Sequence, residues 1–222
     1  TESSVQSITM DDIKDYFKQN ISPIVSHLHI AGNITQDNAE RSLKILANKW
    51  NGNKVKIPKI IIAKIPSKSK VFFIDIPDSK QSAISVGTLT VPGGSPELFK
   101  LSVVNNRLGG GMEARLMRTL RLEKGYTYGA GSFLRENTFQ TPFYAYSQVR
   151  SNVTLESLEI FRDIINGYAK SYNNEDLETT KNKLIKGNAL RFERLASLIN
   201  MLDTMSKYDY SNTYIQNEQE VL

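Results

Sequence analysis

The segment from Leu101 to Tyr128 constrains the fold more than any other part of the chain, because a run of glycines separates two helical patterns within it. Apolar residues first recur at helical spacing, at Leu101, Val104 and Leu108. Gly109, Gly110 and Gly111 then remove the side chains where the chain changes direction. A second apolar period follows and ends at Gly125. The segment therefore predicts a helix, a tight bend, a second helix and an aromatic strand.

The N-terminal part of the chain predicts a helix, a strand and another helix. Thr9 is followed by two aspartates, as expected at a helix start, and the helix should end before Pro23. Apolar and polar residues alternate over 24–30, which predicts a strand. A helix is expected over 36–50, and the lysine- and proline-containing stretch 51–70 predicts a connector.

The remaining pattern is typical of an α+β fold. Four more strands are predicted, at 71–76, 83–91, 126–134 and 143–149, with helices continuing to about Tyr208. This order predicts a mixed or antiparallel sheet of four to five strands, with helices packed on one face.

Composition excludes several classes of function. The chain has 222 residues and no cysteine, so disulfides, thiolate nucleophiles and cysteine-bound zinc are absent. Its net charge of +5 comes from scattered lysines without a dense basic run, which argues against nucleic-acid binding. No run approaches the roughly 18 apolar residues of a membrane span. The threonine start suggests a longer precursor, and the composition is compatible with the cell envelope, the periplasm and the cytoplasm.

The sequence LGGGMEARLMRTLRLEKGYTY, residues 108–128, resembles the pitrilysin and insulinase family of zinc metallopeptidases, which includes the mitochondrial processing peptidase. HLHIAGNI, FFIDIPDSKQSAISVG and TTKNKLIKGNALRFE resemble further segments of that family, in the same order. The resemblance is to the second, non-catalytic lobe of these two-lobed enzymes. It implies that residues 1–50 end the preceding catalytic lobe, 51–70 link the lobes, and 71–222 form the inactive lobe.

The zinc motif of the family, H-x-x-E-H, is missing from this chain. The two histidines, His27 and His29, lie two apart on a predicted strand with no acidic residue between them, so a structural role is favoured over a metal site. We expect no metal and no catalytic residue in this chain alone. Zinc would come from the catalytic lobe, in the same polypeptide or in a partner subunit.

The resemblance implies an arginine and a tyrosine, seven residues apart, that reach the active site between the lobes. Arg121 and Tyr128 have this spacing and are the expected substrate-binding residues. The alternative is structural: Arg121 would offset a helix dipole, and Tyr126 and Tyr128 would pack on one face of a strand. Arg118 and Tyr126 are the competing residues in the motif, but they lack the seven-residue spacing.

Gly109, Gly110 and Gly111 are similar to the family's flexible loop beside the substrate chamber, although a bend between two packed helices explains them equally well. One departure follows the glycines. Many relatives have Ser-Ser-Arg-Leu where this chain has Glu113-Ala114-Arg115-Leu116, so a serine that could cap the second helix is lost.

Two functions are predicted. The first is the non-catalytic lobe of a two-lobed zinc metalloendopeptidase, inactive alone, which helps to enclose and orient a peptide substrate. The alternative is a non-enzymatic scaffold or peptide-binding subunit. A basic surface-binding module is a third, generic hypothesis. Expected partners are the zinc-bearing lobe, peptide substrates and a second copy of the fragment in a homodimer.

Overall fold

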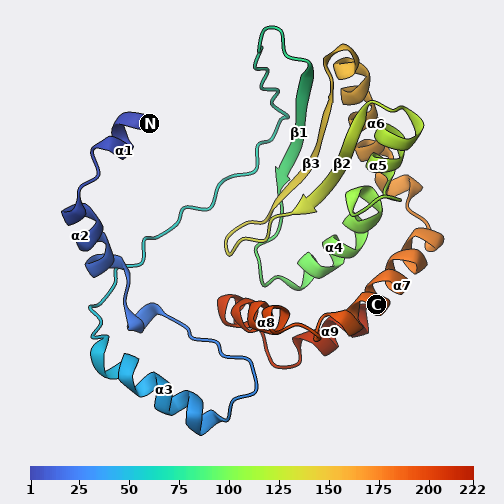
Figure 1. Ribbon diagram of the computed structural model, residues 1–222. Coiled ribbons are helices and arrows are strands. Elements are labelled where there is room, and N and C mark those ends of the chain that lie inside the picture. The colour runs from blue at the N-terminus through green and yellow to red at the C-terminus, as the bar shows by residue number, and fades with distance from the viewer. The chain divides into compact units, whose positions relative to one another are not determined.

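The computed structural model describes residues 1–188 and 190–222. Its helices and strands follow in chain order (Figure 1): α1 (Glu2–Gln6), α2 (Met10–Asn20), η1 (Pro23–Val25), α3 (Gln36–Lys49), β1 (Gln81–Leu89), α4 (Pro96–Gly109), α5 (Arg115–Met117), η2 (Arg118–Glu123), β2 (Thr127–Leu134), β3 (Pro142–Arg150), η3 (Ser151–Val153), α6 (Thr154–Ser171), α7 (Asn174–Leu190), α8 (Leu195–Tyr208) and α9 (Tyr214–Val221).

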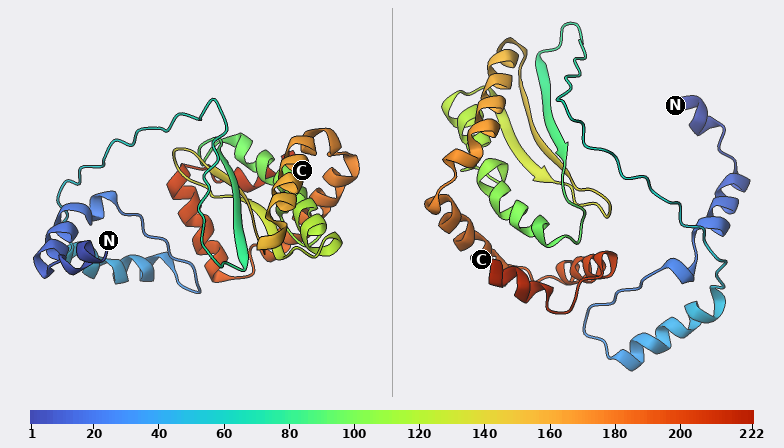
Figure 2. Two further views of the ribbon diagram at one scale, coloured as in Figure 1. Left: turned by 90° about the horizontal axis from the view of Figure 1, so that it is seen from above. Right: turned by 180° about the vertical axis from the view of Figure 1, so that it is seen from behind.

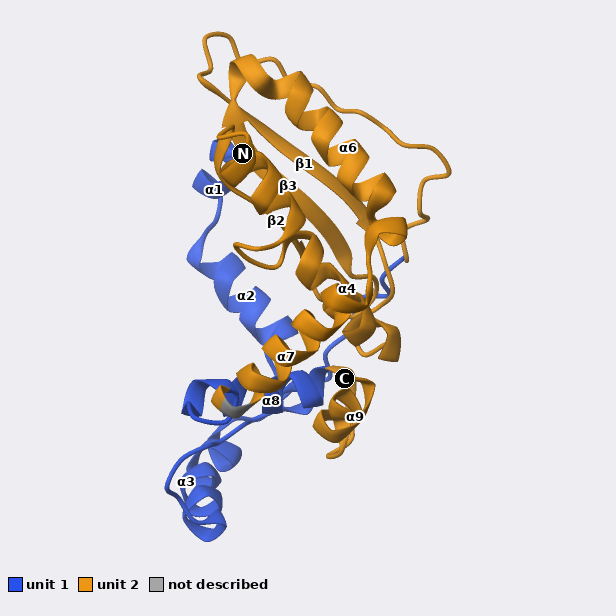
Figure 3. Ribbon diagram, turned by 90° about the vertical axis from the view of Figure 1, so that its right-hand side faces the viewer, with its two compact units in different colours: residues 1–61, 191–207 blue, residues 62–190, 208–222 orange. Residues whose placement is uncertain are grey.

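The sheet has three antiparallel strands in the order β1-β3-β2. Helix α6 runs along the sheet and contacts β1 and β3 (Figures 1 and 2). The chain forms two compact units (Figure 3): one comprises residues 1–61 and 191–207, and the other, which holds the sheet, comprises 62–190 and 208–222. The predicted α+β class is thereby confirmed.

The two helices predicted in the N-terminal part are confirmed, and each begins at a threonine cap. Thr9 Oγ1 accepts a hydrogen bond from Asp12 N at 3.2 Å, while Asp12 Oδ2 accepts one from Thr9 N at 2.8 Å. Helix α3 begins after Thr35, whose side chain accepts from Asn38 N. The bonds at both caps, reciprocal at Thr9 and single at Thr35, satisfy amide groups that a helix start leaves unpaired.

The strand predicted over 24–30 is not formed. Residues 23–25 make the short 3₁₀ helix η1, and residues 26–30 have no regular structure. Pro23 begins this turn, and the buried Ser22 side chain accepts from Ile24 N at 3.3 Å. An alternating pattern forms a strand only beside another strand, and the described residues of this unit contain none.

The strands at β2 and β3 are confirmed within a residue or two, and the predicted strand at 83–91 is found at 81–89. The strand predicted over 71–76 is not formed, so the count of four to five strands is not confirmed. Its side chains from Val71 to Ile74 are 82% to 92% exposed. The segment ends in a turn where Ser79 N donates to Ile76 O at 3.2 Å, and β1 keeps an unpaired outer edge.

The core lies where α4 to α6 meet one face of the sheet. Its fully buried side chains include Leu116, Leu120 and Phe161, from three different elements, and Val149 of β3. The opposite face carries aromatic side chains: the Phe133 ring lies 5.4 Å from that of Tyr144. Burial of the first face orders the chain on both sides of the glycine-rich bend.

The outer edge of β2 is covered by α4. Asn105 Nδ2 donates a hydrogen bond to Ser132 O at 3.2 Å, and Gly109 lies directly against the backbone of Ser132. The two outer edges of the sheet therefore differ: among the described residues the outer edge of β1 is unpaired, while α4 packs against that of β2.

Candidate functional site

The glycine-rich bend is packed against β2. Helix α4 ends at Gly109, where an added Cβ atom would lie 2.1 Å from Ser132 N and 2.6 Å from Gly131 C. Real Cβ atoms essentially never come this close to backbone atoms. Close packing of the helix end on the strand accounts for Gly109 without a ligand.

Asp176 joins the two sides of this bend. Its carboxylate accepts from Arg107 Nε at 3.0 Å and from Arg115 Nη2 at 2.6 Å, and its side chain is only 8% exposed. Arg107 lies in the last turn of α4 and Arg115 is the first residue of α5. One carboxylate at the start of α7 therefore holds both helices through charge-assisted bonds.

Arg115 is also held by α6. Its guanidinium lies 4.7 Å from the centre of the Tyr168 ring and donates to Ser171 O at 2.7 Å. Tyr168 Oη donates to Val104 O at 2.6 Å, and burial raises the pKa of this phenol, so it stays protonated. As expected from the loss of serine, Ala114 makes no side-chain cap at the start of α5. Contacts to Arg115 from α6 and α7 fix this helix start.

The ion pairs lower the pKa of Asp176. Burial, the largest single influence, raises the pKa of this carboxyl. Hydrogen bonds from Arg107 and from the Asn173 N–H, together with the charge of Arg115, outweigh burial and bring the pKa below its usual value.

This lowered pKa gives a pH dependence of stability. A carboxyl whose folded pKa lies below its unfolded value, about 3.9, stabilises the fold above that pH and loses this contribution as the pH falls. We expect the free energy of unfolding to drop more steeply between about pH 5 and pH 3 in the wild type than in Asp176→Asn. Urea denaturation at a series of pH values measures both slopes, and parallel profiles would contradict the expectation.

Arg121 lies on a widened helical turn and faces solvent. Residues 118–123 form the π-helix η2, in which Lys124 N donates to Thr119 O at 3.1 Å. The exposed Arg121 side chain has its Nη1 3.7 Å from Met112 Sδ. Arg118 instead pairs with Glu123 Oε1 at 3.0 Å. Of the two arginines, only Arg121 has no acidic partner among the residues that the structure describes.

Tyr128 is brought to the surface by a bulge in β2. The pairing with β3 shifts between Thr127 and Ala130, so two residues of β2 lie opposite one of β3. The Tyr128 side chain is 89% exposed, whereas Tyr126 packs against the core. The structure thus separates the two tyrosines that regular alternation places on one face.

Arg121 and Tyr128 are joined by a short capped segment. Gly125 adopts a left-handed conformation with φ of 63°, and its N–H donates to Arg121 O at 3.1 Å, which ends the helix. Within the described residues the two side chains make no hydrogen bond with each other. Both side chains are exposed.

The histidines do not form a metal site. His27 is exposed and His29 is half-buried. Across residues 1–188 and 190–222, no three His, Asp or Glu side chains come together in a group that could hold a metal ion. The described residues therefore offer no such group to hold zinc.

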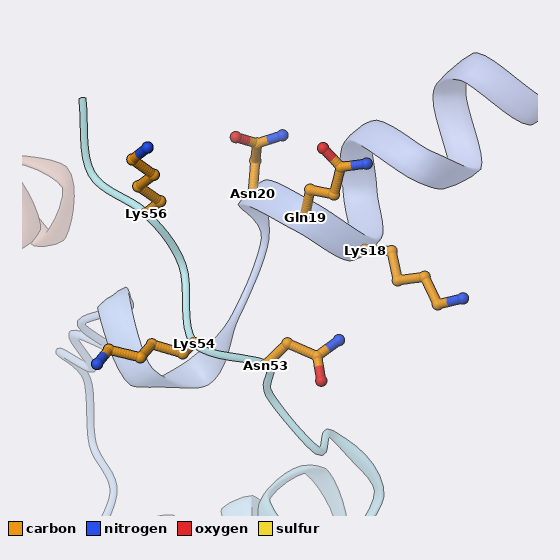
Figure 4. A pocket seen from close by; sticks show the side chains of 6 residues that line it. All are labelled: Lys18, Gln19, Asn20, Asn53, Lys54 and Lys56. Carbon is orange, nitrogen blue, oxygen red and sulfur yellow. The ribbon is translucent and has the colours of Figure 1, made fainter.

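A hollow of the first unit, about 450 Å³ in volume, offers no converging set of ligand groups. Its lining residues are lysines and amides: Lys18, Gln19, Asn20, Asn53, Lys54 and Lys56. Figure 4 shows Lys18 and Lys54 pointing away to opposite sides. The lysines therefore do not converge on one ligand.

Comparison with protein families decides the identity of the fold. The model of the peptidase M16 inactive domain matches residues 7–184, most of the chain. The chain belongs to this family. The M16 inactive domain from Pseudomonas fluorescens has a similar structure, with a TM-score of 0.87 over 98% of this chain and 52% of that one, at 22% identity.

Two curated relatives of this M16 inactive domain carry different descriptions. One is "Non-peptidase homolog YmxG" of Helicobacter pylori, 23% identical over all of this chain and 50% of the relative. The other is "Uncharacterized zinc protease YmxG" of Bacillus subtilis, 24% identical over 60% of this chain and 31% of the relative. This chain thus spans at most about half the length of these relatives. No helix among the described residues is long and apolar enough to cross a membrane.

The close approach of Gly109 to β2 predicts a sensitive position in this M16 inactive domain. We expect Gly109→Ala to lower the free energy of unfolding by about 1–3 kcal/mol, because the new methyl group overlaps the Ser132 backbone. Gly167→Ala is the matched control, since this α6 glycine has open space around its Cβ position and alanine should stabilise the helix by about 0.5–1 kcal/mol. Denaturant titration compares the two, and equal effects would contradict the packing of Gly109.

Sequence reasoning missed the residues that hold the bend of this M16 inactive domain. Asp176 appears in the sequence only as an acidic residue in the first turn of a helix, and its partners lie 61 and 69 positions away. Arginines on both sides of the glycines, Arg107 and Arg115, were the available signal. They show that positive charge flanks the bend but do not identify Asp176 as the shared partner.

Proposed function

We propose that this chain is part of a two-lobed zinc metalloendopeptidase and forms its non-catalytic lobe, which helps to enclose and orient peptide substrates. In this proposal residues 1–50 end the catalytic lobe, 51–70 link the lobes and 71–222 form the inactive lobe. The zinc ion and its ligands come from the catalytic lobe. The observation that carries the proposal is the joint exposure of Arg121 and Tyr128 on one short segment.

The two side chains suit the chemistry of peptide hydrolysis. Attack on a peptide bond builds negative charge on the carbonyl oxygen, and hydrogen-bond donors fixed near that oxygen stabilise the transition state. A guanidinium presents several N–H donors with a permanent positive charge, and a phenol adds an O–H donor. Neither Arg121 nor Tyr128 uses its donors on an acidic side chain within the described structure.

A non-enzymatic scaffold or peptide-binding subunit is the second candidate. It is supported by the Helicobacter pylori relative, which is described as a non-peptidase homologue. The unpaired edge of β1 would also give an isolated copy a surface for pairing with a second copy. This candidate needs no zinc-bearing partner.

Reconstitution distinguishes the two functions. The chain is mixed with a zinc-bearing lobe that carries H-x-x-E-H, from the same gene or a neighbouring one, and cleavage of a quenched fluorescent peptide is followed. We expect no cleavage by the chain alone, and cleavage by the mixture that a chelator abolishes. A zinc lobe that is equally active with and without this chain would refute the proposal.

A further inference from the structure

Two side chains of helix α7, Asp176 and Lys183, bind the glycine-rich bend and the residues beside it. Asp176 binds Arg107 and Arg115 on either side of the bend. Lys183, seven residues later, lies on the same side of the helix, because seven residues make about two turns. The two residues therefore contact the bend from one face of one helix.

Lys183 binds the bend directly. Its Nζ donates to Gly110 O at 3.1 Å and to Asn106 Oδ1 at 3.2 Å. A Cβ atom added at Gly111 would lie 3.4 Å from this Nζ. The ammonium thus binds the last turn of α4 and the carbonyl that follows it, and it lies beside the position that a side chain at Gly111 would take.

The bend in turn contacts Arg121. Met112 follows Gly111 directly, and its Sδ lies 3.7 Å from Arg121 Nη1. Among the described residues this is the one hydrogen-bonding contact found for the Arg121 side chain. A shift of the bend would therefore change the surroundings of the Arg121 guanidinium without touching Arg121 itself.

We propose that Lys183 is a positioning residue, which holds the glycine-rich bend so that Met112 keeps Arg121 in place for the substrate. The inference rests on the proposed function, in which Arg121 faces the scissile bond. Lys183 itself touches neither the substrate nor the reacting atoms. Its effect should appear in the chemical step more than in substrate binding.

The first test measures the bend without any catalysis. The chain has no cysteine, so Glu113→Cys gives a single site for a nitroxide label within the bend. We expect Lys183→Met to increase the mobility of this label in electron paramagnetic resonance spectra. Lys186→Met is the matched control, because this lysine of α7 is exposed and no contact is recorded for it in the described structure. Unchanged label mobility in Lys183→Met would overturn the proposal.

The second test is a double-mutant cycle in the two-lobed assembly. Misplacing a catalytic group by about 1 Å can cost up to about a hundredfold in rate, so for this exposed lysine we expect Lys183→Met to lower kcat by about tenfold with little change in KM. In the Arg121→Ala background the same substitution should have no further effect, because Lys183 acts through Arg121.

The outcomes separate this inference from the proposed function. Equal losses of kcat in both backgrounds would overturn the positioning role while leaving the role of Arg121 intact. If Arg121→Ala itself leaves turnover unchanged, the proposed function fails, and the positioning role fails with it. A mobile label together with a non-additive loss of kcat supports both.

Discussion

Replacing Arg121 by alanine is expected to lower kcat of the two-lobed assembly by about a hundred- to a thousandfold, the usual cost of removing one donor to a developing oxyanion. KM should change little, because the interaction strengthens only in the transition state. Steady-state cleavage of a fluorescent peptide, with the zinc lobe in fixed excess, measures both constants.

Arg118→Ala is the control for this substitution. Arg118 lies three residues earlier on η2, carries the same charge and is bound to Glu123 at the surface. An exposed pair of this kind contributes about 0–1 kcal/mol to stability, so the variant should fold and retain turnover. Similar losses in both variants would show a general effect of surface charge and would contradict the specific role of Arg121.

Tyr128→Phe completes the comparison, because it removes one hydroxyl from an exposed side chain and leaves the core untouched. A fall in kcat without a change in unfolding free energy would assign the hydroxyl to the reaction. Full activity of Tyr128→Phe would restrict the substrate-facing role to Arg121.

The largest loss of stability is expected at Phe161. This α6 side chain is fully buried in the same cluster as Leu116 and Leu120, which flank the start of η2. Phe161→Ala removes a whole ring from a closed core and should cost about 3–5 kcal/mol. For a chain of this size that loss lowers the melting temperature by about 6–20 °C.

Leu158→Ala, three residues earlier on the same helix, is the control for this loss. Its side chain is 44% exposed, so truncation leaves little cavity and the loss should stay well below that of Phe161→Ala. Thermal unfolding followed by circular dichroism compares the two variants. Equal losses would mean that the cluster around Phe161 does not hold the sheet and α6 together.

Local patterns were sufficient for elements whose stabilising contacts are near in sequence or in the same sheet. The threonine caps at Thr9 and Thr35 mark helix starts that the structure confirms. The strands at 127–134 and 142–150 pair with each other across a short connection, and their alternation predicts them correctly. The segments 24–30 and 71–76 are also predicted as strands, but neither is paired in the described structure, and an extended segment becomes a strand only when a neighbouring backbone bonds to it.

The sequence identified the residue types of the candidate site, but it did not predict the π-helical turn or the bulge that position them. Spacing and resemblance singled out Arg121 and Tyr128, and their roles toward a substrate remain predictions. The widened turn at η2 and the bulge in β2 decide which arginine is unpaired and which tyrosine is exposed. Both features depend on packing between distant segments, which the periodicity of a single segment does not encode.

The unequal edges of the sheet limit how copies of this chain can assemble. At the β2 edge, Asn105 of α4 donates a hydrogen bond to the Ser132 carbonyl, whereas the outer edge of β1 is unpaired among the described residues. Edge-to-edge pairing is then restricted to β1 against β1, which uses the same surface on both copies and closes with two-fold symmetry. A continuous assembly of sheets would need two free edges on each copy, and α4 packs against the β2 edge. Association through the sheet should therefore stop at two copies.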